Sequence, residues 1–184
     1  MYELLFLFQQ KVRVIFLTNG WRYWETFEMV SQLLEEKGEV AREAHFLYGS
    51  KKKRKGEKDG DIEEEIGDVL LALACFSNSK GYYLSIAFQK GTSGRCEYMQ
   101  TDPLILVAEL ASRVGSFCDE VIGQYEIEGE DGLISNEHIE IRIGNILRTL
   151  DHLAERVGCT FEGAMQKNIN KTTVTDKGRF PDGV

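Results

Sequence analysis

The sequence repeats itself at a constant offset of 77 residues (144 minus 67). Ile66-Gly67 returns as Ile143-Gly144. The same offset matches further positions, namely Leu33 and Leu110, Gly38 and Gly115, Glu43 and Glu120, Tyr48 and Tyr125, Leu70 and Leu147, Gly81 and Gly158, and Lys90 and Lys167. An ungapped repeat that keeps apolar residues and glycines in register indicates two copies of one structural unit. Residues 26–90 and 103–167 are therefore expected to share one fold.

The repeated unit is expected to be helical. The chain contains only two prolines, and its apolar residues recur at three- and four-residue spacing with little alternation. This spacing is typical of amphipathic helices. Residues 26–48 are predicted to form one helix, whose expected apolar stripe contains Phe27, Val30, Leu33, Leu34, Val40, Ala41, Ala44 and Leu47.

Capping signals predict where other helices start. Asp61 is followed three residues later by Glu64, which predicts a capping box and a helix that ends near Gly81. Asp102-Pro103 predicts an N-cap with proline at the first position of another long helix. A first helix is expected within residues 1–17, and a short one around residues 85–90.

Two helical units that cannot each bury an apolar stripe alone are expected to pack together. The predicted fold class is therefore all-α, a helical bundle of two tandem units packed as a pseudo-dimer. Residues 1–95 are assigned to the first unit, and residues 96–184 to the second unit with its C-terminal tail.

Composition excludes several classes of protein. A formal net charge of −8 argues against a general nucleic-acid-binding surface and suits a protein that attracts cations. Polar residues interrupt the apolar segment at 1–17, so neither a signal peptide nor a membrane span is expected. The four cysteines, which lack zinc-ligand spacing, favour a reduced, cytoplasmic compartment; they are Cys75, Cys96, Cys118 and Cys159.

Four acidic residues of the first copy form two helical pairs. Glu36 and Glu39 lie three residues apart, as do Glu65 and Asp68, so each pair projects from one helix face. Apolar neighbours border both pairs, and clustered, partly buried carboxylates are costly unless a cation lies between them. Oxygen ligands favour Mg²⁺, with Mn²⁺ as an alternative. A solvated acidic face is the other interpretation of these pairs.

The second copy helps to decide between these interpretations. Its residues at the positions of the four acids are Arg113, Ser116, Arg142 and Asn145. The apolar framework around those positions persists, although the acids do not. A requirement of the fold would have applied to both copies, so the carboxylates are interpreted as a functional site of the first copy only.

The acids stand in a recognisable order. The chain reads Glu35-Glu36-Lys37-Gly38-Glu39 and then, after a spacer, Glu65-Ile66-Gly67-Asp68. This order resembles the pattern E-E-x-x-E, spacer, E-x-x-D of the MazG-type all-α nucleoside triphosphate pyrophosphohydrolases. The resemblance covers residues 21–90, and the second copy resembles a degenerate unit. Lys37 departs from the pattern, because the family usually has an apolar residue there.

The resemblance implies a reaction and a metal site. Glu36, Glu39, Glu65 and Asp68 would bind Mg²⁺, which grips the triphosphate and orients a water. Hydrolysis between the α- and β-phosphates would yield nucleoside monophosphate and pyrophosphate, which removes unwanted nucleotides from the pool. Such chemistry suits a metal that neutralises phosphate charge and activates water. A glutamate of the Glu36/Glu39 pair would accept the proton of that water.

A phosphate-binding element is expected from the second copy. The family often carries K-x-x-N-[KR], and here only the second copy retains it, in residues 167–171. We therefore expect the first copy to supply the metal cage and the second to supply Lys167, Asn170 and Lys171. Arg113 and Arg142 either contact substrate as well or form salt bridges where acids were lost.

Two tryptophans precede the first acidic helix. The rings of Trp21 and Trp24 are candidates for stacking on a nucleobase, and packing between helices is the alternative use.

The sequence is compatible with several functions. The leading one is a Mg²⁺-dependent nucleoside triphosphate pyrophosphohydrolase; an enzyme specific for dUTP, dCTP or phosphoribosyl-ATP is an alternative. A nucleotide- or metal-binding regulator without turnover is the alternative from another class. Because related proteins assemble as dimers or dimers of dimers, the resemblance implies a homo-oligomer of tandem chains.

Overall fold

The computed structural model describes residues 1–56, 59–92, 102–175 and 178–182. Within these residues the chain forms seven α-helices, one short 3-10 helix and no strand, which confirms the all-α class. The elements are α1 (Tyr2–Asn19), α2 (Thr26–Tyr48), α3 (Ile62–Lys80), α4 (Leu84–Lys90), α5 (Pro103–Glu128), η1 (Asp131–Leu133), α6 (Glu137–Arg156) and α7 (Phe161–Val174). The expected unit boundary at 95/96 and Cys96 lie outside the described residues.

The helix starts follow the capping signals. The side chain of Asp61 accepts hydrogen bonds of 3.0 and 3.4 Å from two backbone N–H groups in the first turn of α3. Asp102 accepts one of 2.8 Å at the start of α5. At α3 the described contacts form only the Asp61 half of the capping box expected with Glu64. A reciprocal capping box is formed instead at α2, between Glu25 and Glu28.

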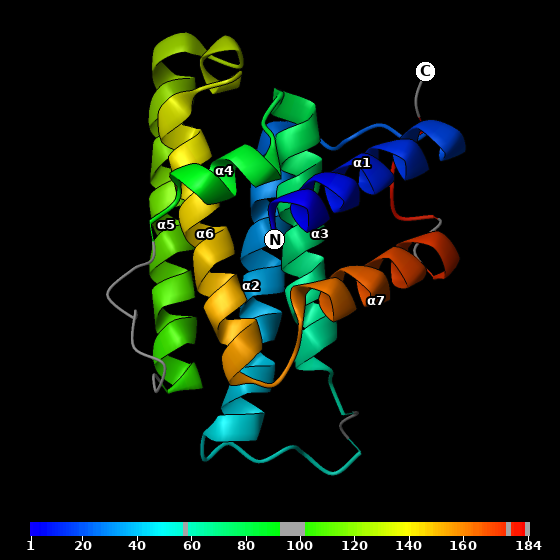
Figure 1. Ribbon diagram of the computed structural model, residues 1–184, viewed down its shortest axis with the longest axis vertical. Helices are drawn as coiled ribbons and strands as arrows, with labels where there is room; N and C mark the ends of the chain where they lie inside the picture. The colour runs from blue at the N-terminus through cyan, green and yellow to red at the C-terminus, as the bar shows by residue number, and fades with distance from the viewer. Residues whose placement is uncertain (57–58, 93–101, 176–177, 183–184) are drawn as a thin grey trace.

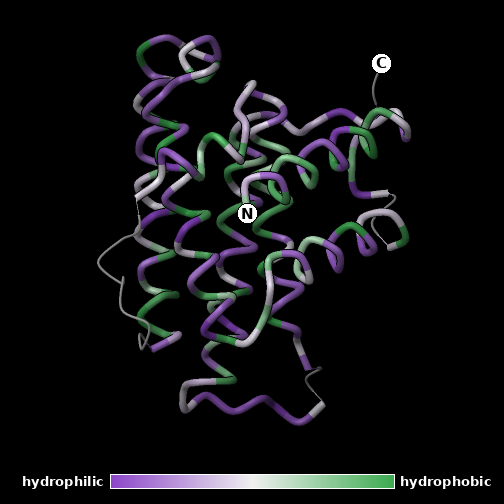
Figure 2. The backbone as a smooth tube through the Cα atoms, viewed as in Figure 1, coloured by the Kyte–Doolittle hydropathy of each residue, from purple (hydrophilic) through white to green (hydrophobic). Residues whose placement is uncertain are grey.

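Four long helices build the body of the molecule (Figure 1). α2 packs on α3, α5 packs on α6, and contact between α2 and α5 joins the two halves. α1 and α7 lie on one side of this bundle, where both contact α3. The connection between α2 and α3, with its lysine run at 51–55, projects beyond one end of the bundle and is strongly hydrophilic (Figure 2).

The short third helix of each half packs on the other half. α4 lies against α6, and α7 lies against α3. Ion pairs fasten both contacts at matching positions, because Lys90 Nζ lies 2.7 Å from Glu140 and Lys167 Nζ lies 2.7 Å from Glu63. The two ion pairs are related by the same 77-residue offset (140 minus 63).

Two glycines allow these close helix contacts. A Cβ on Gly144 would overlap the backbone carbonyl group of Ala87 on α4, coming within 2.8 Å of its carbon. A Cβ on Gly67 would overlap the carbonyl oxygen of Ala164 and lie 3.1 Å from Asn168 Cβ on α7. The repeated Ile-Gly pair is therefore the point at which a third helix crosses a second one.

The apolar stripe expected on α2 is only partly buried. Val30, Leu33, Val40 and Ala44 belong to the core, together with Met29. Three members of the expected stripe, in contrast, are exposed at 40 to 58% of their surface, so their expected burial was wrong; they are Phe27, Leu34 and Leu47. The partners of α2, which are α3 and α5, cover one flank of the wide stripe and leave the other to solvent.

In the part of the chain that the structure describes, every helix is too short or too polar to span a bilayer.

Candidate metal centre

Three carboxylates of the first half converge between α2 and α3. Glu36 comes from α2, and Glu65 and Asp68 come from successive turns of α3. One oxygen of each lies within 4.8 Å of the others. The spacing of three residues puts Glu65 and Asp68 on one face of α3, and the packing of α2 on α3 brings Glu36 opposite them.

The cluster is electrostatically crowded. Burial raises the pKa of Glu65 from its ordinary value of 4.5 to about 7, and the charges of Asp68 and Glu39 add to the rise. Burial, followed by the charge of Asp68, also raises the pKa of Glu36. Burial likewise raises the pKa of Asp68, although Lys171 and Asn168 act against it. These carboxylates thus favour a proton or a cation between them.

Glu39 lies beside this cluster and not within it. Its carboxylate forms an ion pair with Arg42, and Arg42 also reaches Glu65 at 3.7 Å. Glu39 is nevertheless close enough for its charge to raise the pKa of Glu65. The four acids singled out in the sequence therefore lie together as three clustered carboxylates and one neighbour held by arginine.

The second half closes the cluster through α7. Asn168 Nδ2 donates a hydrogen bond of 2.7 Å to Asp68 Oδ1. Lys171 Nζ donates to Asp68 Oδ2 and lies 3.0 Å from Glu64. Burial acts to lower the pKa of Lys171, but its contact with Asp68 raises that pKa above the ordinary value. The contact of α7 with Gly67 brings both donors to Asp68.

The other two residues expected from the phosphate-binding element lie elsewhere. Lys167 is bound to Asp61 and Glu63 at the start of α3. Asn170 accepts a hydrogen bond of 3.0 Å from Gln166 on an exposed surface. Of Lys167, Asn170 and Lys171, the described contacts therefore bring only Lys171 to the clustered carboxylates.

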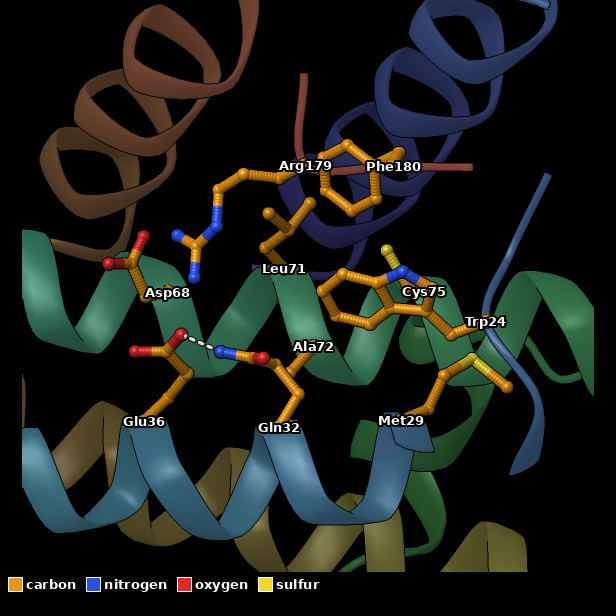
Figure 3. Close-up of a pocket in the computed structure, with 10 residues that line it drawn as sticks. All are labelled: Trp24, Met29, Gln32, Glu36, Asp68, Leu71, Ala72, Cys75, Arg179 and Phe180. Atoms are coloured by element: carbon orange, nitrogen blue, oxygen red, sulfur yellow. Dashed lines mark hydrogen bonds between the residues drawn. The ribbon is translucent and has the colours of Figure 1, made fainter. Parts of the chain in front are cut away.

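An apolar slot adjoins the carboxylates (Figure 3). Glu36 and Asp68 line one end, to which the guanidinium of Arg179 extends, whereas Trp24 and Phe180 line the other. The rings of Trp24 and Phe180 are stacked with centroids 5.3 Å apart. Trp21 does not line the slot; it packs on Phe180 at 5.1 Å, which is a supporting position.

The C-terminal tail is attached to the segment before α2. Arg22 N–H donates a hydrogen bond of 2.9 Å to the carbonyl of Pro181, and Trp21 and Asp182 form an antiparallel bridge. This attachment holds Arg179 and Phe180 over the slot.

The matching positions of the second half have a different chemistry. Arg113 lies 3.0 Å from Glu109, and Arg142 lies 3.7 Å from Glu120. Asn145, at the position of Asp68, accepts a hydrogen bond of 2.9 Å from the backbone N–H of Thr92. Ser116 lines an open groove beside Arg142. These contacts favour the interpretation of Arg113 and Arg142 as salt-bridge partners.

Some residues of the site were not anticipated from the sequence. Gln32 hydrogen-bonds to Glu36, Asn168 holds Asp68, and Arg179 and Phe180 cover the slot. A signal for Asn168 existed, because it lies three residues before Lys171 and so shares a helix face with it. Gln32 stands likewise one turn before Glu36. No local signal connects the tail to Trp24.

The donor set fits a hard divalent cation. It consists of carboxylate oxygens, without a histidine or cysteine among the three clustered ligands. Mg²⁺ and Mn²⁺ favour such ligands, and Mg²⁺ is commonly shared with phosphate oxygens. The raised pKa values of Glu36 and Glu65 show that the carboxylates gain from positive charge between them.

The stability of the metal-free protein should fall as pH rises. Between about pH 4.5 and 7 the folded protein keeps a proton on Glu65 that the unfolded chain has lost, so each step up in pH favours unfolding. Mg²⁺ at about 100 times its Kd should stabilise the fold at pH 8 by about 2.7 kcal/mol, or about 5–10 °C in Tm. Thermal unfolding with Mg²⁺ or EDTA at pH 5.5 and 8 measures both effects.

Protons compete with the metal, so the Mg²⁺-dependent rise in Tm should be smaller at pH 5.5. Glu65→Gln should weaken both the pH dependence and the response to Mg²⁺. An equal rise at both pH values in the wild type would contradict a carboxylate metal site.

Comparison with known proteins assigns the first half to a family. Residues 25–101 match the family described as the MazG nucleotide pyrophosphohydrolase domain. The uncharacterized protein YpjD of Bacillus subtilis (strain 168) is 49% identical over 57 residues, which are 31% of this chain and 51% of that relative. The chain thus spans about half the length of that curated relative. No solved structure matches. Residues 25–101 are therefore similar to the MazG nucleotide pyrophosphohydrolase domain family.

Proposed function

We propose that this protein hydrolyses nucleoside triphosphates to nucleoside monophosphate and pyrophosphate in a Mg²⁺-dependent reaction. The observation that carries this proposal is the convergence of Glu36, Glu65 and Asp68 within 4.8 Å. The match of residues 25–101 to a nucleotide pyrophosphohydrolase family supports it. Removal of unwanted nucleotides in the cytoplasm is the role that we infer.

The residues of the site have distinct tasks in this proposal. Glu36, Glu65 and Asp68 hold the metal. Glu39 becomes a further ligand when it releases Arg42 and binds the metal ion. The bound metal would neutralise phosphate charge and lower the pKa of water. Glu36 or Glu39 accepts the proton of the attacking water. Asn168 donates a hydrogen bond to Asp68 Oδ1 and so fixes the orientation of that carboxylate.

We also infer that the chain is a fused pseudo-dimer with one active centre. The reciprocal packing of α4 on α6 and of α7 on α3 supports two copies of one unit. The first copy supplies the acids, and the second supplies Lys171 and Asn168. Two such chains are proposed to associate as a homodimer.

The contact between Lys171 and Asp68 favours one alternative function. An ammonium group that neutralises Asp68 lets the protein hold its carboxylates together without a metal, as a nucleotide-binding regulator requires. Enzymes specific for dUTP, dCTP or phosphoribosyl-ATP are further alternatives within the same reaction class.

One assay separates these proposals. Pyrophosphate and phosphate release are measured from canonical and modified NTPs, dNTPs and phosphoribosyl-ATP, with Mg²⁺ or EDTA. Metal-dependent pyrophosphate release from several NTPs is the expected result. Release from a single substrate would favour the specific enzymes. Folded protein that binds nucleotides but releases neither product would favour the regulator and contradict the hydrolase.

Lys171→Met should raise KM for the triphosphate by about 10- to 150-fold and change kcat little. We propose that metal at Asp68 frees Lys171 to contact a phosphate, and a charged hydrogen bond contributes about 1.5–3 kcal/mol. Steady-state kinetics of pyrophosphate release give both constants.

Lys90→Met is the matched control, because Lys90 pairs with Glu137 and Glu140 on the other half. It should leave KM unchanged. Lys167→Met tests the other lysine of the expected phosphate-binding element at residues 167–171. Because Lys167 contacts Asp61 and Glu63, this variant should raise KM less than Lys171→Met does. Equal KM values for the Lys171 variant and the wild type would contradict phosphate binding by Lys171.

A further inference from the structure

The slot beside the carboxylates has two chemically different ends. Glu36, Asp68 and Arg179 bring charge to one end (Figure 3). The other is lined by aromatic, aliphatic and sulfur-containing side chains, namely Trp24, Met29, Leu71, Ala72, Cys75 and Phe180. This division matches a nucleotide, whose phosphates bind charge and metal and whose base binds apolar surface and aromatic rings.

Gln32 stands where the two ends meet. It lies one helical turn before Glu36 on α2, a separation of about 6 Å along the helix axis. Its amide nitrogen Nε2 donates a hydrogen bond to Glu36 Oε1. The carbonyl oxygen Oε1 is consequently on the side of the amide away from Glu36 (Figure 3), and Gln32 lines the slot.

A metal ion at Glu36 would keep Gln32 in this orientation. A carboxylate that binds a cation is ionised and can only accept hydrogen bonds, so it requires the NH₂ side of the amide. The opposite side of the same amide is its carbonyl, which also can only accept. The slot therefore presents a fixed acceptor one helical turn from the metal site, and a ligand group that meets it must be a donor.

We propose that Gln32 determines specificity by accepting a hydrogen bond from a sugar hydroxyl group of the nucleotide. This inference rests on the proposed function of the same site. The sugar is attached directly to the α-phosphate, so it is the part of the substrate that follows the metal-bound phosphates along the slot. The base lies farther along, between side chains that offer no amide, carboxylate or guanidinium group. The protein is therefore selective for the sugar and tolerant of the base.

Phe180 must move to admit a base. The slot has a cavity volume of about 30 Å³, which is room for about one water molecule. Phe180 belongs to the tail and stacks on Trp24, so displacing its ring opens the apolar end while Gln32 stays on α2.

Equilibrium binding tests the role of Gln32 without relying on turnover. Calorimetry with Mg²⁺ compares α,β-methylene analogues of ATP and UTP with their 2′-deoxy, 3′-deoxy and 2′,3′-dideoxy forms. The wild type should bind the hydroxylated analogue about tenfold more tightly than the dideoxy form, because loss of the donor leaves the acceptor of Gln32 unpaired beneath the bound nucleotide. The two monodeoxy forms show which hydroxyl is recognised.

Gln32→Met should reduce the affinity ratio, which is the affinity for the hydroxylated analogue divided by that for the dideoxy form, to about one. The ratio is taken within one variant, so a partly folded sample does not change it. Gln124→Met is the matched control, because Gln124 donates an equivalent 3.0 Å hydrogen bond to Glu120 on α5. It should keep the wild-type ratio. Mg²⁺ titration of each variant without nucleotide separates an effect on the metal from an effect on the sugar.

Three outcomes would overturn the inference. The first is that the wild type binds dideoxy and hydroxylated analogues equally. The second is that Gln32→Met keeps the wild-type affinity ratio. The third is that Gln32→Met loses this ratio only because it no longer binds Mg²⁺. In these cases nucleotide binding itself still supports the proposed function. Failure of both the adenine and the uracil series to bind would overturn the proposed function together with the inference.

Discussion

Asp68→Asn is expected to lower the rate of pyrophosphate release by about 100- to 1,000-fold, the range seen when one preorganised electrostatic contact to the transition state is removed. Asp68 is buried and clustered with Glu36 and Glu65, and asparagine has no charge with which to hold Mg²⁺. Asparagine has the same shape and can still accept the hydrogen bond from Asn168, although its NH₂ group cannot accept from Lys171. Pyrophosphate release and Mg²⁺ titration by calorimetry measure the two consequences.

Asp151→Asn provides the matched control. Asp151 is also a partly buried aspartate whose pKa is raised by burial, but it lies on α6 outside the carboxylate cluster. Its variant should keep the wild-type rate and Mg²⁺ affinity. If Asp68→Asn retained more than about a tenth of the rate with its metal dependence intact, the proposed metal centre would be wrong.

Gly144→Ala should destabilise the fold by about 3 kcal/mol, a large value for one methyl group. The added Cβ would overlap the carbonyl group of Ala87, and because the obstacle is backbone, α4 has to move away from α6. A loss of this size should lower Tm by about 6–12 °C for a chain of this length. Thermal unfolding followed by circular dichroism gives the change.

Gly115→Ala is predicted to have the opposite sign. Gly115 lies inside α5, and a Cβ there meets nothing within 4 Å. Alanine is favoured over glycine in a helix by up to about 1 kcal/mol, so this variant should be slightly more stable than the wild type. A decrease of equal size in both variants would show that close packing of α4 on α6 is not the cause.

Much of the fold follows from local signals. α2 was predicted with its observed bounds, and Asp61 and Asp102 cap the helices that they were expected to open. These features depend on side chains and backbone groups a few residues apart, which a sequence displays directly. The burial of Phe27 was predicted wrongly, because periodicity defines an apolar stripe but not how much of it the neighbouring helices cover.

The proposed metal centre could be predicted only in part from local sequence pattern. The pairing of Glu65 with Asp68 on one face follows from helical spacing, and the absence of acids at the matching second-half positions follows from the repeat. That Arg42 holds Glu39, and that Asn168 and not Asn170 meets Asp68, depends on how α7 crosses α3. A shift of two residues along a helix turns a side chain by about 200°, so the crossing decides which asparagine faces the site.

The sequence by itself determined the all-α class, the caps at Asp61 and Asp102, the 77-residue repeat and the choice of carboxylates as candidate ligands, since each is a relation between neighbours or between matching positions of two copies. Only the tertiary structure decided that α4 and α7 pack on the opposite halves, that Phe180 returns to Trp24, and that Gln32 faces the slot. These contacts join segments far apart in the chain, and they are selected by shape and by close backbone approach at Gly67 and Gly144. Such complementarity exists only once the helices are packed.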